Sequence, residues 1–419
     1  MAPSAIQNQD VDLTAAAIQV KDAQAAKPSV APLDASKLTY NLTPSPRTVP
    51  SEAAANALSE TICTDHMVTA VWSAASGWAT PELKPYGPLS LMPTASCLHY
   101  ATECFEGLKA YRGYDGRLRI FRPERNAARM RMSAGRISLP VFEPAELVKL
   151  MTALLAVDGP RWLPKERPGA FLYLRPTLIG TQSQLGVQAP KEAMLYIIVS
   201  FMPRLDAPAG GMRLHTSPED MVRAWVGGFG YAKVGANYGP SLMATQDARQ
   251  RGFHQILWLY GPDGEFTEAG ASNFFMVWKR KDGKKELITA PLDDKLILDG
   301  VTRRSCLDLV RERLAGELEV TERKYTIDEV LEADAEGRIL ESFAAGTAVS
   351  YSQAWLKIPL ADQSIVLCVP HLPDSPPRAR RQHPHGLRGS PWRDYQQGQG
   401  MAGRHHVRPH PARVGRCHS

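Results

Sequence analysis

A single lysine lies within a glycine-rich segment, residues 225–240, with the sequence WVGGFGYAKVGANYGP. Five glycines surround Lys233, and Tyr231 and Tyr238 flank it. Glycines at this density let a backbone approach a ligand closely and adopt positive φ angles. A lysine held there is a candidate nucleophile for a Schiff base. The competing interpretation is a surface turn with a solvated lysine, because isolated glycine motifs are weak evidence.

The length and composition indicate a globular protein of two or three domains. The chain has 419 residues, of which 44% are apolar, and no apolar run approaches the roughly 18 residues of a membrane span. Six cysteines lie far apart, which fits neither a disulfide framework nor a zinc site and suits a reducing compartment. We therefore expect no metal ion and no membrane partner.

The formal net charge of +6 is concentrated in the C-terminal segment. Residues 371–419 hold nine arginines against only Asp374 and Asp394, a net of +7, which leaves −1 for the rest of the chain. The basic charge therefore gives no evidence that the folded part binds nucleic acid.

The N-terminal residues are rich in Ala, Pro, Ser and Thr, and we expect a disordered leader over residues 1–37. Asp10, Asp12 and Asp22 precede the first arginine, Arg47. Because mitochondrial presequences are rich in arginine and poor in acidic residues, we expect a cytoplasmic location, with a mitochondrial one as the alternative.

Hydrophobic periodicity predicts the elements of a small α/β domain over residues 38–202. We expect a hairpin over residues 108–121, helices over 121–136 (opening at Pro123) and 143–157, and buried strands over 171–180 and 194–202.

Periodicity breaks in PRLDAPAGGM, residues 203–212, where we expect the domain linker. A larger domain over residues 213–349 follows. We expect strands over 255–260 and 265–278 around a GPDG turn, a helix within 297–316 with its apolar side at Leu307, Leu309, Val310 and Leu314, and a strand over 339–349. Two blocks of this kind indicate two α/β-type domains facing each other.

The lysine segment resembles the catalytic segment of the branched-chain amino-acid aminotransferases, which use pyridoxal 5′-phosphate on the fold-type-IV scaffold. Similar windows follow in the family's order from about residue 33 to residue 348, FEGLKAYRG and FTEAGASNFF among them. The resemblance implies an α/β (α+β) fold with a small N-terminal and a larger C-terminal domain. It also implies an active site between the domains and a homodimer.

The resemblance assigns the cofactor's reactive end to three residues. Lys233 would hold pyridoxal phosphate, Glu268 would face the pyridine nitrogen, and Tyr238 would hydrogen-bond the phenolic oxygen. Without the family, Glu268 would be interpreted as a solvated residue at a strand end and Tyr238 as a core or interface residue.

For the cofactor's phosphate, the resemblance implies Arg129 in RNAARM and the hydroxyl of Thr347. It also implies the backbone of Val301 and Thr302, in DGVTRRS. A glycine leading into a helix N-terminus presents free N–H groups, which suits phosphate. The alternatives are an exposed helix arginine and an ordinary helix cap.

For the substrate, the resemblance implies Tyr100, Phe105, Tyr173 and Arg175, with a backbone N–H at Ala348 for the α-carboxylate. Alternation along a strand places Tyr173 and Arg175 on one face. The aromatic residues would line a pocket for Leu, Ile or Val side chains. Arg175 would meet the distal carboxylate of glutamate in the second half-reaction.

The chain departs from the family at several points. Ala271 stands where some members have threonine, and residues 203–212 contain no aromatic residue. From about Val349 the resemblance stops, so we expect the end of the large domain to be missing. Residues 350–419 would form an aberrant, mostly disordered tail, whose seven histidines leave a metal- or nucleic-acid-binding role as the alternative to a shifted reading frame.

The resemblance implies transamination between L-leucine, L-isoleucine or L-valine and 2-oxoglutarate. The partners would be small molecules, with neither nucleic acid nor membrane. The rivals are another fold-type-IV activity, D-amino-acid aminotransferase or aminodeoxychorismate lyase, and a product impaired by its altered C-terminus.

Overall fold

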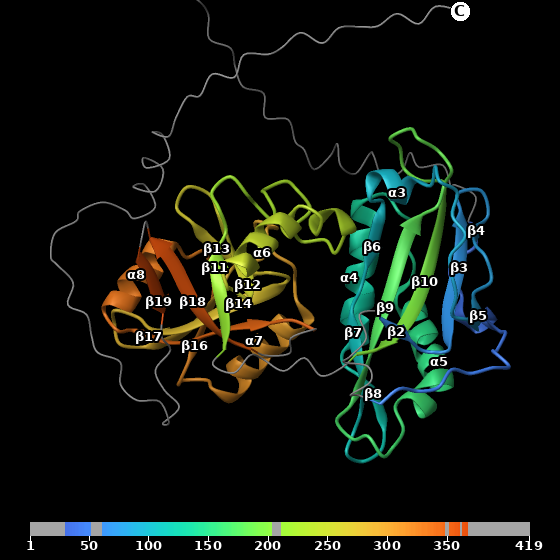
Figure 1. Ribbon diagram of the computed structural model, residues 1–419, viewed down its shortest axis with the longest axis horizontal. Helices are drawn as coiled ribbons and strands as arrows, with labels where there is room; N and C mark the ends of the chain where they lie inside the picture. Colours follow the sequence, from blue (N-terminus) through green and yellow to red (C-terminus); the bar gives the residue numbers. More distant parts are fainter. Residues whose placement is uncertain (1–29, 52–60, 203–210, 348–351, 361–362, 368–419) are drawn as a thin grey trace, which may run out of the picture. The chain divides into compact units, whose positions relative to one another are not determined.

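The computed structural model describes residues 30–51, 61–202, 211–347, 352–360 and 363–367, with the backbone alone for 352–367. The chain divides into two compact units, Met1–Met202 and Pro203–Ser419, each built on its own sheet (Figure 1). Most of the predicted leader and of the predicted tail lies outside the described residues.

Unit 1 contains a ten-stranded sheet with the order β1-β5-β3-β10-β9-β7-β8, to which β2, β4 and β6 add at β10, β3 and β9. Nearly all of its pairings are antiparallel; β1 and β5 run parallel. Its strands are β1 (Thr39–Tyr40), β2 (Ile62–Cys63), β3 (His66–Ser73), β4 (Gly77–Trp78), β5 (Glu82–Pro85), β6 (Glu103–Phe105), β7 (Leu108–Arg112), β8 (Leu118–Ile120), β9 (Phe171–Gly180) and β10 (Glu192–Phe201).

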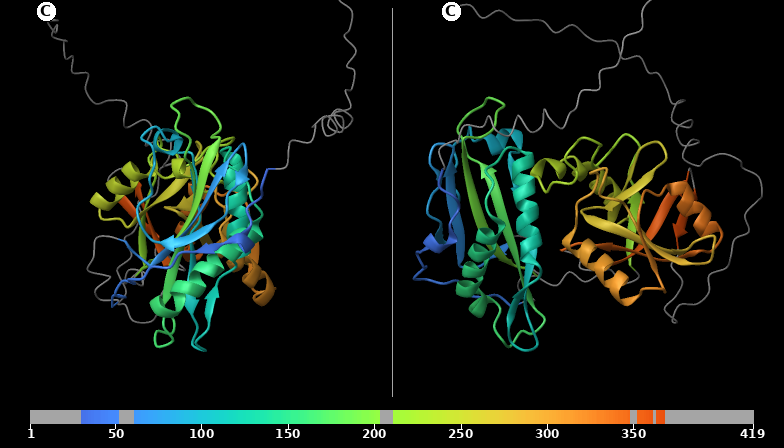
Figure 2. Two further views of the ribbon diagram at one scale, coloured as in Figure 1. Left: turned by 90° about the vertical axis from the view of Figure 1, so that its right-hand side faces the viewer. Right: turned by 180° about the vertical axis from the view of Figure 1, so that it is seen from behind.

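Two long helices of unit 1 pack against each other, and α5 lies on β3 and β9 (Figures 1 and 2). Both begin with proline at the first helical position, whose missing N–H has no intrahelical acceptor in any case. The apolar positions predicted for the second helix are all buried, as expected for a core helix. The helices of unit 1 are η1 (Ala35–Lys37), α3 (Ser96–Tyr100), α4 (Pro123–Arg136) and α5 (Pro144–Trp162).

Unit 2 contains a nine-stranded sheet with the order β13-β12-β11-β18-β17-β14-β15-β16, and β19 pairs with β18. An additional pairing joins β13 to β14, so the six strands from β13 to β14 form a closed ring. The strands are β11 (Met212–Thr216), β12 (Gln255–Tyr260), β13 (Glu265–Ala269), β14 (Ser272–Lys279), β15 (Lys285–Thr289), β16 (Glu319–Glu322), β17 (Ile339–Ala345), β18 (Ser352–Leu360) and β19 (Gln363–Leu367).

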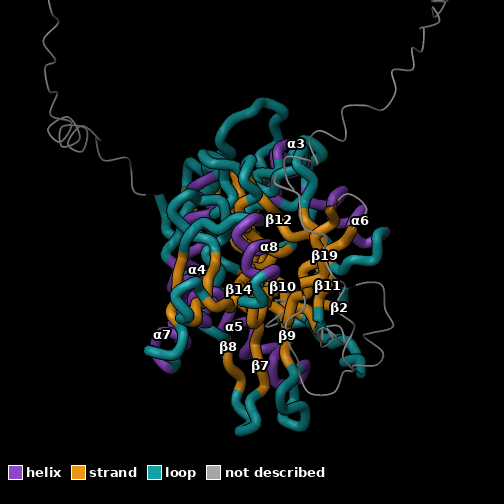
Figure 3. The backbone as a smooth tube through the Cα atoms, turned by 90° about the vertical axis from the view of Figure 1, so that its left-hand side faces the viewer, coloured by secondary structure: helices purple, strands orange, loops and turns teal. Residues whose placement is uncertain are grey.

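The core of unit 2 contains aromatic and aliphatic side chains. Phe266 stacks on Tyr325 with ring centroids 4.8 Å apart, and Phe275 stacks on Phe343 at 4.7 Å. Helices α6, α7 and α8 contact β12, β16 and β17 respectively. The three helices are labelled in Figure 3. The helices of unit 2 are η2 (Gly235–Asn237), α6 (Ser241–Gln250), α7 (Val301–Arg313) and α8 (Ile327–Ala335). No helix in the described part of the chain is long and apolar enough to cross a membrane.

The structure corrects three expectations for unit 2. Residues 265–278 form not one strand but two, β13 and β14, because Gly270 turns the chain at φ 59°. On α7, Leu307 is buried but Leu309 and Leu314 are exposed. The sheet also continues past residue 349, since β18 pairs with β11 and β17, so the large domain extends at least to Leu367.

Candidate active site

The predicted Schiff-base lysine lies in the loop between β11 and α6, just before the short helix η2. Its Nζ donates a hydrogen bond to Tyr238 Oη at 3.0 Å, and both side chains are half-buried. Asn237 ties the loop to itself by donating to the carbonyls of Ala232 and Phe229. The loop therefore holds Lys233 and Tyr238 together as one group.

The predicted pyridine partner, Glu268, is buried at the end of β13. Its Oε1 accepts hydrogen bonds from Leu298 N at 2.9 Å and from Asn273 Nδ2 at 3.2 Å. Asn273 lies directly opposite Glu268 in the β13–β14 hairpin and also donates to Leu298 O at 2.9 Å. The hairpin and the segment before α7 thus fix the carboxylate in one orientation.

The other oxygen of this carboxylate faces an arginine. Arg223 Nη2 lies 2.7 Å from Glu268 Oε2, with 8% and 2% of the two side chains exposed. The two side chains form a buried ion pair, and Oε2 accepts no hydrogen bond from the described residues. Arg223 also donates to Leu296 O at 3.1 Å, which links the lysine segment to the segment that contacts Glu268.

The predicted phosphate anchor at α7 begins beside the same asparagine. Gly300 caps α7 without a side chain, and a Cβ at this position would lie only 2.1 Å from Asn273 Oδ1. Glycine is therefore required by close approach. The first N–H groups of a helix have no intrahelical acceptor, and those of Val301 and Thr302 begin α7, as the anion site requires.

Thr347 lies just past the end of β17, the strand that pairs with β14. Ala345 pairs with Asn273 across β14 and β17, and Thr347 follows two residues later. Asn273 therefore brings Glu268, the start of α7 and the turn at Thr347 to one end of the unit 2 sheet. Ala348, the predicted α-carboxylate donor, lies outside the described residues.

In unit 1, the predicted phosphate arginine lies on α4 and is held by a carboxylate. Arg129 donates from Nε to Glu106 Oε1 at 2.7 Å and from Nη2 to Glu106 Oε2 at 2.8 Å. Glu106 is completely buried in the segment between β6 and β7. Arg129 is therefore not the exposed helix residue of the alternative interpretation, since 9% of its side chain is exposed.

Three of the predicted substrate residues form one cluster in unit 1. The Arg175 guanidinium lies 4.7 Å from the Phe105 ring centroid and 5.2 Å from that of Tyr173, and Nη2 donates to Tyr173 Oη at 3.1 Å. Gly107 makes room for this tyrosine, because a Cβ there would lie 1.9 Å from Tyr173 Oη. Arg175 Nε is buried and has no hydrogen-bond partner among the described residues.

Tyr100 stands apart from this cluster in its contacts. It ends α3, is 38% exposed, and its hydroxyl donates to the carbonyl of Leu185.

Cys104, next to Phe105, is buried, and burial raises the pKa of its thiol. The thiol therefore stays protonated and is no nucleophile.

Comparison with known proteins decides the family. The family model for class IV amino-transferases matches residues 103–336. The mitochondrial branched-chain-amino-acid aminotransferase of Saccharomyces cerevisiae is 48% identical over 326 residues, covering 77% of this chain and 81% of that protein. The cytosolic enzyme of Mus musculus is 47% identical, over 68% and 73%. The chain belongs to the branched-chain class IV aminotransferases.

Solved structures agree on the fold of this aminotransferase. The Thermoproteus uzoniensis branched-chain aminotransferase with norvaline has a TM-score of 0.54 at 24% identity, covering 70% of this chain and 86% of that one. A second branched-chain amino acid aminotransferase, complexed with N-(5′-phosphopyridoxyl)-L-glutamate, has a TM-score of 0.52 at 25% identity, over 69% and 85%. The enzyme of Thermobaculum terrenum in its PLP-form has a TM-score of 0.53 at 24% identity, over 68% and 84%.

The donors of this aminotransferase fit pyridoxal phosphate. Glu268 is a buried carboxylate that stays close to a cation, since Arg223 lies beside its Oε2, and such a carboxylate suits a pyridinium N–H. No side chain caps the start of α7, which suits a phosphate. The described residues contain no group of three or more His, Cys, Asp or Glu side chains that could hold a metal ion.

Three residues that pair with the predicted site residues were not predicted: Glu106, Arg223 and Asn273. Asn273 could have been predicted from the sequence, because a turn at Gly270 places it opposite Glu268 in a hairpin. Glu106 and Arg223 are distant in sequence from the side chains they pair with, and no periodicity connects such pairs.

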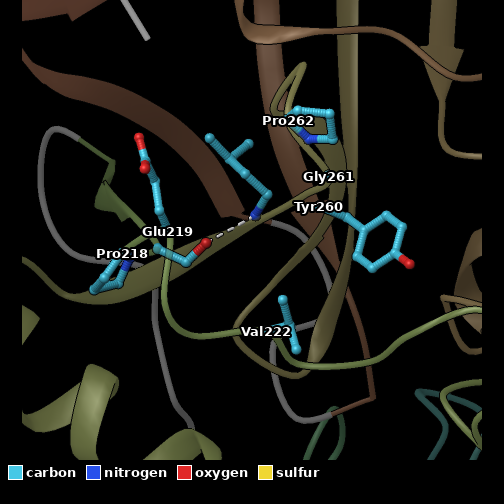
Figure 4. A pocket seen from close by; sticks show the side chains of 8 residues that line it. Pro218, Glu219, Val222, Tyr260, Gly261 and Pro262 are labelled. Carbon is cyan, nitrogen blue, oxygen red and sulfur yellow. Dashed lines mark hydrogen bonds between the residues drawn. The ribbon is translucent and has the colours of Figure 1, made fainter. Parts of the chain in front are cut away.

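A pocket of unit 2 lies away from the predicted residues, between the segment after β11 and the turn that joins β12 to β13 (Figure 4). Leu259 N donates to Ser217 Oγ at 3.0 Å beside it. None of the predicted cofactor or substrate residues described here lines this pocket. Its lining residues are Ser217, Pro218, Glu219, Val222, Leu259, Tyr260, Gly261 and Pro262.

Proposed function

We propose that this chain transfers the amino group of branched-chain L-amino acids to a 2-oxo acid, with pyridoxal phosphate as its cofactor. The observation that carries the proposal is the hydrogen bond between Lys233 and Tyr238 at 3.0 Å, in the unit that also buries Glu268. These are the three residues that the reactive end of the cofactor needs.

Pyridoxal phosphate, when bound, supplies a carbonyl for the amino group and a ring that stabilises negative charge on the substrate α-carbon. Lys233 Nζ is the base that takes the α-proton and returns it. Tyr238 Oη accepts the hydrogen bond that orients Nζ. Glu268 Oε2 holds a proton on the ring nitrogen, while Leu298 and Asn273 hold the carboxylate in place through Oε1.

Phosphate binding is assigned to Arg129, Thr347 and the N–H groups of Val301 and Thr302. An arginine fork and a helix N-terminus both suit an anion with several acceptor oxygens. Arg129 belongs to unit 1, and the other three residues belong to unit 2.

On the substrate side, Phe105 and Tyr173 supply apolar surface, and Tyr100 and the backbone of Ala348 complete the assigned set. Arg175 receives the distal carboxylate of glutamate or 2-oxoglutarate. Its buried Nε without a partner supports this role, because a buried unpaired donor costs free energy until a ligand meets it. The solved structure whose ligand joins phosphopyridoxyl to L-glutamate supports glutamate as the second amino acid.

We further propose a homodimer in the cytoplasm. The relatives include a mitochondrial and a cytosolic enzyme of Saccharomyces cerevisiae, so relationship alone does not decide the compartment. The scarcity of arginine and presence of aspartate near the N-terminus favour the cytoplasm.

The test is an absorbance spectrum of the purified chain with pyridoxal phosphate, followed by addition of L-leucine and 2-oxoglutarate. We expect L-leucine to change the cofactor spectrum and 2-oxoglutarate to restore it, while D-alanine leaves it unchanged. Lys233→Ala should abolish both the lysine-bound spectrum and turnover but retain the circular dichroism of the parent. A response to D-alanine alone, or parental turnover by Lys233→Ala, would contradict the proposal.

A further inference from the structure

Glu106 is a buried carboxylate that the mechanism above does not use. It lies between β6 and β7 and accepts four hydrogen bonds. Two come from Arg129, at 2.7 and 2.8 Å, one from Asn126 Nδ2 at 2.8 Å, and one from Gly107 N at 3.3 Å. Such a fully paired buried carboxylate has one fixed orientation.

The contact with Arg129 uses both oxygens of the carboxylate. Nε meets Oε1 and Nη2 meets Oε2, which is the parallel two-bond arrangement in which arginine and carboxylate lie in one plane. Glu106 therefore fixes the plane of the guanidinium as well as its position.

Two opposite consequences for phosphate binding follow from this geometry. An oriented arginine needs no ordering when the phosphate arrives, which favours binding. A negative carboxylate beside it offsets part of its charge, which opposes binding. Orientation dominates here, because a long arginine that lost its buried acceptors would turn toward solvent and present no fixed edge.

We propose that Glu106 is the positioning residue for the phosphate anchor: it holds the guanidinium of Arg129 in the one orientation that binding the phosphate of pyridoxal phosphate requires. The inference rests on the proposed function, since it takes Arg129 as the phosphate residue. Asn126 supports the arrangement by fixing Glu106 from α4, the same helix that carries Arg129.

The experiment compares the affinity of the apoprotein for pyridoxal phosphate and for pyridoxal, which lacks the phosphate, by absorbance titration. Arg129→Lys comes first and tests whether Arg129 binds the phosphate. It should lower the affinity for pyridoxal phosphate and leave the affinity for pyridoxal unchanged. If both ligands bind Arg129→Lys as they bind the parent, the assignment of Arg129 fails. That failure is distinct from a failure of Glu106.

Glu106→Gln should then lower the affinity for pyridoxal phosphate by roughly 10- to 100-fold, the usual effect of losing a hydrogen bond between charged groups. The affinity for pyridoxal should stay within about twofold of the parent, so the ratio of the two affinities should fall. In the Arg129→Lys background the same change should have no further effect on this ratio. Asn126→Ala should also lower the ratio of the two affinities, but by a smaller factor. It provides a second test if Glu106→Gln folds poorly.

Asp65→Asn is the matched control. Asp65 is also a buried carboxylate of unit 1, and it accepts hydrogen bonds from the side chains of Arg161 and Trp162 and from Arg47 N. It should lower the melting temperature of the apoprotein without changing the ratio of the two affinities. Tighter binding of pyridoxal phosphate by Glu106→Gln, an equal loss for both ligands, or an unchanged ratio would each overturn the positioning role.

Discussion

Replacing Glu268 by glutamine separates the two roles that this carboxylate has, one in stability and one in turnover. The amide oxygen of glutamine can keep the hydrogen bonds that Oε1 accepts from Leu298 and Asn273. The amide nitrogen then replaces Oε2 and faces Arg223, which lies 2.7 Å away in a buried site. Two donors now face each other, and the arginine loses its counter-charge.

The magnitude follows from this burial. Removing one partner of a buried ion pair costs about 3–5 kcal/mol, because the other charge remains unpaired. Arg223 keeps its hydrogen bond to Leu296 O, so we expect the lower part of this range, about 3 kcal/mol. For a unit of this size that lowers the melting temperature by about 6–12 °C.

The assay is calorimetry of the apoprotein, in which no cofactor contributes. The second variant combines Glu268→Gln with Arg223→Met and removes both charges. A buried ion pair replaced by apolar groups is often neutral in stability, so we expect the double variant to melt near the parent. Turnover should stay about 10²- to 10³-fold below the parent in both variants, the usual effect of removing one preorganised electrostatic partner.

These outcomes refute the reasoning in different ways. If Glu268→Gln has the melting temperature of the parent, then the buried charge of Arg223 does not need Glu268 as its partner. A double variant that remains as unstable as the single one would show that the loss has another cause. Parental turnover in either variant would remove Glu268 from the pyridine nitrogen.

Three further predictions follow. Arg175→Ala should reduce the rate with glutamate more than that with L-leucine in stopped-flow half-reactions, because only glutamate has a distal carboxylate; equal losses would contradict its role. Burial acts to raise the pKa of Asp65, but hydrogen bonds from Trp162 and Arg47 N and the charge of Arg161 outweigh it and hold that pKa below its ordinary value. Its stabilisation is therefore complete above about pH 4 and is lost as pH falls through the lower folded value, so the melting difference between Asp65→Asn and the parent should narrow below about pH 4; a constant difference would contradict this. Ending the chain after residue 349 should lower the melting temperature and promote aggregation, whereas ending it after Leu367 should change neither; equal melting of both truncations would contradict the role of β18.

The sequence predicted the elements whose signals are local. The hairpin over 108–121 and the helix that starts at Pro123 are present as expected. The apolar spacing of residues 147–155 also identified a buried helix face correctly. In each case, residues within one turn or one hairpin determine the outcome.

On α7, the predicted apolar side included leucines that cannot share one face of a helix. Leu307 and Leu309 are two positions apart and therefore point about 200° away from each other on a helix, so one face cannot bury both. The structure buries Leu307 and exposes Leu309. Val310, three residues after Leu307, packs with it in the core. Leu314 has the right spacing as well, but α7 ends at Arg313, and Leu314 is exposed beyond it.

The identities of the site residues came from resemblance, but their partners could not. Arg129 pairs with Glu106, and Glu268 with Arg223, across segments that are brought together only by the fold. Each pair is buried, so its energy depends on desolvation and on geometry that sequence spacing does not contain. Asn273 is the exception, because recognising the turn at Gly270 would have placed it opposite Glu268.

The C-terminal boundary shows how a prediction from resemblance can miss a short strand. The resemblance to the family stops at about Val349, and arginine, proline and histidine are frequent in residues 371–419, so a tail was predicted from residue 350. Ser352–Leu360, however, pairs parallel to β11 on one side and antiparallel to β17 on the other. Without this strand, β11 and β17 would each present unpaired backbone at an open edge, and the ring would be broken between them. β17 leads directly to Thr347, which we propose binds phosphate, and β17 pairs with β14, which carries Asn273 opposite Glu268.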